Sequence, residues 1–155
     1  MKYFYLITLS LFFSIYFSVS YSQNSLSFDG VSDYVNCGSN TSLNVTGTAL
    51  TLEAWIYPTS WKTQVWQGNI ISKESAVGTG YMLRAGSNGR LNVNIGSGGP
   101  WNELTSFNSV LTLNTWQHVA ATYDGSFLRL YVNGVITDSV VKTVSIVGTA
   151  TNNLY

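Results

Sequence analysis

One stretch near the C-terminal end, residues 116–134, constrains the fold of this chain more than any other. It holds two runs of alternating apolar side chains, residues 119–123 and 128–132, joined by a turn that begins Asp124-Gly125. A second turn, Asn133-Gly134, follows at once and leads into a third apolar run. Asp-Gly and Asn-Gly favour tight hairpins because their residues tolerate positive φ angles. The stretch predicts an antiparallel meander with one buried face, which places the chain in the all-β class.

The rest of the chain adds short strands between turns that are rich in glycine. In residues 50–57, one face carries Leu52 and the opposite face carries Trp55. Both faces are partly apolar, so this strand is expected in the middle of a sheet. No helical periodicity of useful length follows residue 22, and an antiparallel two-sheet β-sandwich is predicted. The other expected strands are residues 25–28, 34–37, 69–73, 81–84, 91–95, 105–110, 136–141 and 144–147.

The composition excludes some classes of partner and one class of crosslink. Lys and Arg together number seven, as do Asp and Glu, so net charge attracts neither nucleic acid nor an anionic membrane. Aromatic residues make up 14% of the chain, which suits a sandwich whose strands are aromatic and β-branched. Cys37 is the only cysteine, so no intrachain disulfide can form, and it is predicted to be buried as a small hydrophobe.

The N-terminal segment is predicted to be an export signal. Lys2 precedes an uncharged apolar run over residues 3–19, and Ser20 and Ser22 place small residues at the −3 and −1 positions of a cleavage site. Residues 1–22 are therefore interpreted as a signal peptide and residues 23–155 as one domain. A retained membrane anchor is the alternative, and on either interpretation the protein is secreted or held at the cell surface.

Three blocks of sequence carry a family resemblance. Residues 116–134, residues 52–58, and residues 27–30 with 33–35 resemble laminin-G-like domains of the concanavalin A-like lectin/glucanase superfamily. The resemblance implies a concanavalin A-like jelly roll. Trp55 and Trp116 lie in the strands that resemble the family, and they are therefore expected in the core. The resemblance also implies a further strand with an Asp-Glu pair after residue 155, so we expect a domain that is incomplete at its C-terminus within a longer, multidomain parent chain. This superfamily includes sugar binders, protein binders and enzymes, so the resemblance alone leaves the function open.

The distribution of acidic residues argues against catalysis. Glycosidases need two carboxylates about 5 to 9.5 Å apart, and superfamily members place them on one strand. Here no predicted strand carries two acids. His118, the only histidine, has no nucleophile or orienting acid beside it in sequence and is expected to be structural. The isolated acids are Glu53, Glu74, Glu103, Asp124 and Asp138.

Three tryptophans in polar loops are the candidate ligand-binding residues. Trp61, Trp66 and Trp101 lie in loops rich in small polar residues. An indole can stack on the apolar face of a sugar ring, while side chains such as Asn102 and Arg84 bond its hydroxyls. The sequence therefore predicts a glycan platform, with a loop core that covers one end of the sandwich as the alternative.

Calcium is the cofactor that the resemblance implies. Many related sandwiches hold one ion with Asp and Asn side chains and backbone carbonyls, the oxygen ligands that Ca²⁺ prefers. Asp29 and Asp33 are the candidate metal ligands, and two ordinary turn aspartates are the alternative.

Together these observations predict an exported, non-catalytic recognition module. A glycan is the leading partner, presented to the loop tryptophans. The alternatives are an adhesion module that binds an extracellular protein and an accessory domain of a secreted glycosidase. Neither nucleic acid nor, beyond the export signal, a membrane is an expected partner.

Overall fold

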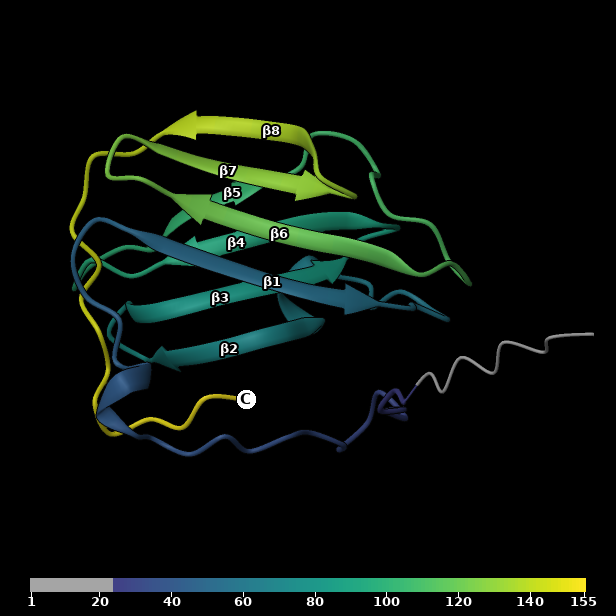
Figure 1. Cartoon of the computed structure of the whole chain (residues 1–155), viewed down its shortest axis with the longest axis horizontal. Helices are drawn as coiled ribbons and strands as arrows, with labels where there is room; N and C mark the ends of the chain where they lie inside the picture. The colour runs from purple at the N-terminus through teal and green to yellow at the C-terminus, as the bar shows by residue number, and fades with distance from the viewer. Residues whose placement is uncertain (1–23) are drawn as a thin grey trace, which may run out of the picture. The chain divides into compact units, whose positions relative to one another are not determined.

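The computed structural model describes residues 24–155 and confirms the all-β prediction. Residues 34–155 form one compact unit, in which two four-stranded antiparallel sheets lie one in front of the other (Figure 1). The first sheet has the order β1 (Leu50–Ile56), β6 (Gln117–Tyr123), β7 (Phe127–Val132) and β8 (Val135–Val141). The second has the order β2 (Asn69–Ser75), β3 (Thr79–Gly86), β4 (Arg90–Ile95) and β5 (Asn102–Thr105). Two short 3₁₀ turns are η1 (Thr41–Leu43) and η2 (Val65–Gln67), and the predicted signal peptide lies outside the described residues.

The core lies between the two sheets and is built from alternate residues of their strands. On β3 and β4 the apolar residues of the core cluster have odd numbers, and the residues between them, polar except for Met82, Gly80 and Gly86, point to the opposite face. This period of two is the pattern that a sheet with one buried face requires. The buried core residues are Leu52, Tyr81, Leu83, Leu91, Val93, Ile95, Leu111, Val119, Ala121, Tyr123, Leu128, Leu130 and Ile146.

The predicted meander is confirmed, and its two turns differ. Asn133 and Gly134 have φ angles of 51° and 77°, as the tight Asn-Gly turn between β7 and β8 requires. At the β6–β7 turn, by contrast, Gly125 has a positive φ and Asp124 does not. The Asp124 carboxylate instead accepts hydrogen bonds from the amides of Ser126 and Phe127, at 2.9 and 2.7 Å. Asp124 therefore forms this turn through its side chain.

Stability of the β6–β7 turn is expected to depend on pH. The Arg129 side chain, which donates to Asp124 Oδ2 at 2.5 Å, and the two turn amides lower the pKa of Asp124 from its usual 3.8 to about 2. A lowered pKa stabilises the folded state above pH 3.8, and this contribution is lost as the pH falls through about 2. In Asp124→Asn the amide oxygen can still accept from the turn, but the charge is gone. We expect the gap between the thermal midpoints of wild type and variant to close across this window, and a constant gap would contradict the assignment.

A buried lysine joins the C-terminal segment to β2. Lys73 lies on the inward face of β2 and has no exposed surface, and its Nζ donates to the backbone carbonyl of Asn152. The amide and carbonyl of Ser72, the residue before it, both bond to Tyr155, at 2.8 and 2.9 Å. A buried ammonium requires such partners because desolvation is otherwise costly. Residues 152–155 are thus held along the outer edge of the second sheet.

Several expected strands are wrong. Residues 25–28 and 34–37 form no strand, and near the C-terminus Ile146 makes only an isolated bridge to Gly47. The strand expected at residues 105–110 is wrong beyond its first residue, because β5 begins at Asn102 and ends at Thr105. Cys37 is exposed, not buried, because no strand of the described residues pairs with its segment. The segment meets the C-terminal residues at an isolated bridge, where the Cys37 amide donates to the Leu154 carbonyl at 2.9 Å and the Gly38 carbonyl accepts from the Leu154 amide at 2.8 Å. These segments lack a neighbouring strand on both sides, and alternation alone does not reveal that.

The expected burial of two tryptophans is also wrong. Among the described residues β1 pairs only with β6, so it is an edge strand and not a central one. Trp55 lies on its outer face with 65% of its surface exposed, and Trp116 is exposed as well. The predicted alternation on β1 holds, but only the Leu52 side of the strand meets the other sheet. The Trp55 face of β1 is partly apolar, but no other part of the described chain packs against it, so apolar residues on a strand face do not by themselves predict burial.

Candidate functional site

The outer face of the second sheet carries the densest group of polar side chains on the two sheets. We call this the polar face and define it by the outward residues of β2 to β5. The strand register aligns them in rows, one of which runs from Arg84 through Asn92 to Thr105. Residues on adjacent strands of one row lie within reach of each other, so they can form a network across the sheet. The members with side chains are Ser72, Glu74, Met82, Arg84, Arg90, Asn92, Asn94, Glu103 and Thr105.

Arg84, predicted from the sequence as a ligand-binding residue, lies on β3, one of the two middle strands of this sheet. Its Nε donates to Asn69 Oδ1 at 2.9 Å, and its Nη2 donates to the Glu74 carboxylate oxygens at 3.2 and 3.3 Å. The guanidinium also contacts the sulfur of Met82. The Arg84 side chain is 12% exposed and that of Glu74 38% exposed. Arg84 is thus held in one geometry, and Glu74 presents a charged acceptor to solvent.

A chain of side-chain amides lies beside this ion pair. Asn94 Nδ2 donates to Asn92 Oδ1 at 2.6 Å, and Asn92 Nδ2 donates to Thr105 Oγ1 at 2.7 Å. Both asparagines are buried although they point away from the core. A buried amide without partners would be costly, so the bonds fix the orientation of each one. The floor of the polar face is therefore rigid before any ligand arrives.

The short turn η2 lies over one end of the polar face. A Cβ placed on Gly86, at the end of β3, would lie 2.7 Å from the carbonyl oxygen of Gln64 and 2.9 Å from the Cα of Val65. Gly86 follows Arg84 by two residues, so its missing side chain would point outward on the same face. Trp66, in this turn, is 60% exposed. The predicted residues Trp66 and Arg84 are thus brought to the same end of one face.

Trp101, Asn102 and Trp61, the other predicted ligand-binding residues, do not lie at the same place as Trp66 and Arg84. Trp101 and Asn102 lie in and after the β4–β5 connection, at the end of the sheet where Ile95 pairs with Asn102. The Asn102 amide donates to Ser97 Oγ at 3.0 Å within that connection. On β3 these two ends lie at Gly86 and Tyr81, which are five residues or about 17 Å apart. Trp61 packs against the core, so a single platform of three tryptophans does not form.

The predicted calcium ligands have partners of their own. Asp29 Oδ1 accepts from the amides of Val31 and Ser32, at 2.7 and 3.2 Å, and Asp33 Oδ2 accepts from the Asp29 amide at 2.9 Å. These bonds are those of aspartates that form a turn. In residues 24–155 no three His, Cys, Asp or Glu side chains group closely enough to hold a metal ion. Two carboxylates supply too few ligands for Ca²⁺ by themselves, so this set does not fit a complete site.

The acids of the polar face are too far apart for a glycosidase pair. Glu74 is on β2 and Glu103 on β5, three strand spacings or about 14 Å apart. Hydrolysis of a glycosidic bond uses carboxylates about 5 to 9.5 Å apart. His118 lies on the other sheet, where its Nε2 is 3.6 Å from Glu53 Oε2. These acids therefore lack the geometry of a hydrolytic pair.

Sequence reasoning missed a second group of exposed side chains, on the outer face of the first sheet. Tyr57 and Trp116 have ring centroids 5.6 Å apart, and Trp55 and His118 have theirs 5.5 Å apart. We call Glu53, Trp55, Tyr57, Trp116 and His118 the aromatic strip. The alternation on β1 already placed three of them on one face, but no sequence signal showed that this face is uncovered.

Comparison with known proteins identifies the family. A family model described as the concanavalin A-like lectin/glucanases superfamily matches residues 29–155. The chain belongs to this superfamily. The match confirms the resemblance drawn from the three sequence blocks, and it agrees with two antiparallel sheets. No curated protein matches the chain, and within the described range no helix is long and apolar enough to cross a membrane.

Solved structures of similar fold include three domains with 16–20% sequence identity. The first is domain 4 of AbnA, an extracellular GH43 arabinanase of Geobacillus stearothermophilus, in complex with arabinotriose (18% identity, TM-score 0.51, 70% of this chain and 50% of that chain). The second is a putative carbohydrate-binding protein of Bacteroides ovatus (20% identity, TM-score 0.50, 71% of this chain and 36% of that chain). The third is the binding domain of Paraclostridial Mosquitocidal Protein 1 (16% identity, TM-score 0.54, 77% of this chain and 34% of that chain). This superfamily member spans half or less of each of these chains, and at this identity they show a shared fold alone.

Proposed function

We propose that this domain is a non-catalytic carbohydrate-binding module that binds its ligand on the polar face, between Trp66 and the Arg84–Glu74 pair. The observation that carries the proposal is an exposed indole in the turn that lies over the Gly86 end of a face with a hydrogen-bonded network of charged and amide groups. An indole stacks on the apolar C–H face of a sugar ring, Glu74 accepts from its hydroxyls and Arg84 donates to them. Because the network is already ordered, binding loses little side-chain entropy.

Two further observations support a glycan as the ligand. The AbnA domain of similar fold was solved with arabinotriose, and the Bacteroides ovatus neighbour is described as a putative carbohydrate-binding protein. The polar face carries neutral amides together with two arginines and two glutamates, Arg84, Arg90, Glu74 and Glu103, whose formal charges cancel. A face without net charge suits uncharged polyols better than an anionic partner. A secreted or cell-surface location agrees with such a ligand, and it rests on the predicted signal peptide.

The accessory-domain alternative has one specific observation in its favour. The AbnA neighbour is a domain of an extracellular arabinanase. In such an arrangement the module would hold the substrate near a catalytic domain of the same parent chain. Binding on the polar face serves both interpretations, and the protein-binding alternative differs from both in its ligand. Calcium at Asp29 and Asp33 stays a prediction from the resemblance.

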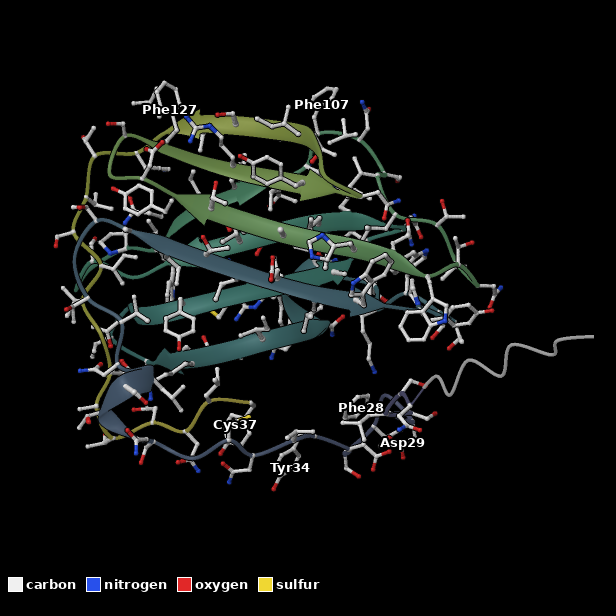
Figure 2. The ribbon with its side chains drawn as sticks, viewed as in Figure 1. Phe28, Asp29, Tyr34, Cys37, Phe107 and Phe127 are labelled. Atoms are coloured by element: carbon white, nitrogen blue, oxygen red, sulfur yellow. The ribbon has the colours of Figure 1, made fainter. Side chains whose placement is uncertain are left out.

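The proposal is tested by screening the full chain on an array of oligosaccharides that includes arabinotriose, followed by titration calorimetry on those that bind. Trp66→Ala is expected to weaken binding at least tenfold, which corresponds to about 1.4 kcal/mol, a normal contribution for a stacked aromatic ring. Phe127→Ala is the matched control, because Phe127 is an exposed aromatic on the first sheet, near the β6–β7 turn (Figure 2). Equal affinities of Trp66→Ala and wild type would exclude the polar-face site.

A further inference from the structure

The aromatic strip on the first sheet is large, exposed and not needed for the core. Trp55, Tyr57 and Trp116 are all exposed, although residues of their size are usually among the more buried ones. The inward residues of the same strands, such as Leu52 and Val119, already fill the space between the sheets. Stability of the sandwich therefore does not explain three large rings in solvent. Contiguous apolar groups at a surface usually mark a binding site.

The polar groups within the strip narrow the class of ligand. The Glu53 carboxylate is exposed and lies 3.6 Å from His118 Nε2, directly beside the Trp55–His118 contact. Glutamate is depleted from the centres of protein–protein interfaces, and a membrane-binding surface favours Lys and Arg over Glu. A sugar, by contrast, offers an apolar ring face and hydroxyl groups at the ring edge. The pairing of open indoles with a carboxylate and an imidazole fits that combination.

The spacing of the strip fits a linear chain of sugars. Glu53 and Trp55 are two residues apart on one face of β1, about 6.6 Å along the strand, and Tyr57, the first residue after β1, continues the same spacing. His118 pairs with Trp55 on the neighbouring strand, and Ala120 pairs with Glu53. Because the Ala120 side chain is small, it leaves space beside the Glu53 carboxylate. One sugar ring of an extended oligosaccharide can lie on Trp55 and the next on the Tyr57–Trp116 pair, with their hydroxyls toward Glu53 and His118.

We propose that the aromatic strip is a second carbohydrate-binding surface, specific for linear chains of pyranoses with unsubstituted apolar faces. It shares its ligand class with the proposed function but lies on the other sheet and uses none of the polar-face residues. With two sites the module can hold a polysaccharide at two points, which raises the apparent affinity for a polymer above that for a short oligosaccharide.

The test separates the two sites by variants of the full chain. The probes are linear β-1,4-linked gluco-, xylo- and manno-oligosaccharides, with the matching polysaccharides for pull-down. Trp66→Ala is used as the background because it removes the polar-face indole. In that background we expect binding to persist, Trp55→Ala to weaken it at least tenfold, and Trp55→Phe to retain part of it. Phe127→Ala, a change on the same sheet face about 20 Å from the strip, is expected to have no effect.

Each outcome bears on one site. Loss of all binding in Trp66→Ala alone would overturn the second surface and leave the polar-face proposal standing. Equal affinities of Trp66→Ala with and without Trp55→Ala would also overturn it. If Trp66→Ala binds like wild type while Trp55→Ala does not, the strip stands and the polar-face proposal fails. Thermal unfolding of each variant checks that the fold is retained, and capture of a protein without any sugar binding would count against the strip.

Discussion

Replacing Gly80 with alanine is expected to destabilise the domain by about 3 kcal/mol or more, since the methyl group adds both backbone strain and a steric clash. Gly80 has a φ of +97°, which is unfavourable for any residue with a side chain. A Cβ at this position would also lie 1.9 Å from the Lys73 carbonyl oxygen and 3.2 Å from the Cα of Glu74. Both atoms belong to the backbone of β2, so the clash can be relieved only by moving β2 away from β3.

A matched control separates the two causes. Gly134 also has a positive φ, +77°, but no heavy atom lies within 4 Å of its virtual Cβ. Gly134→Ala therefore reports the cost of the φ angle alone, about 1 kcal/mol. We expect chemical denaturation to give a much larger loss of unfolding free energy for Gly80→Ala than for Gly134→Ala. Similar losses would mean that β2 moves freely and that the clash is unimportant.

The same variant should affect the polar face. Gly80 pairs with Glu74 in the β2–β3 register, and Glu74 holds the Arg84 guanidinium. A shift of β2 would move the carboxylate away from Arg84. We therefore expect Gly80→Ala to weaken sugar binding even under conditions where the variant is folded.

Leu83→Ala is expected to cost about 3 kcal/mol, within the range measured for leucine truncations in well-packed cores. Leu83 lies in the middle of β3, is fully buried, and pairs with Ile71 and Val93 on the two neighbouring strands. Truncation leaves a cavity that these neighbours cannot fill, because both are held in the sheet. Denaturant midpoints measure the effect, and Val135→Ala, at an exposed position on β8, should change stability by less than about 0.5 kcal/mol. A loss below about 1 kcal/mol for Leu83→Ala would show that the core relaxes around the cavity.

Much of the fold could be predicted from local sequence. The alternation in residues 116–134 and the Asn133-Gly134 turn predict the β6–β7–β8 meander, because turn chemistry and period-two patterning act over a few residues. The alternation in β1 also predicts which of its residues share a face. The short segments at residues 25–28 and 34–37 could not be predicted, because a strand exists only when another strand pairs with it.

The candidate site was predictable in part. The residue types of Arg84 and Trp66, and their place among turns and strands, predict a role in ligand binding. Their common location depends on Gly86, which lets the backbone of η2 lie on the sheet. The bonds from Arg84 to Glu74 and Asn69 join residues 10 and 15 positions apart in sequence. No short-range pattern specifies such pairs, so the network became visible only with the register of β2 and β3.

The sequence by itself determined the class of the fold, its main hairpins and the set of side chains on each face of each strand, because those properties follow from backbone geometry over neighbouring residues. Only the tertiary structure decided which of those faces are covered. Trp55 and Leu52 lie on opposite sides of the same strand, and the second sheet packs against the Leu52 side alone. Burial depends on contacts between residues distant in sequence, and for that reason the exposed aromatic strip could not be predicted from the sequence.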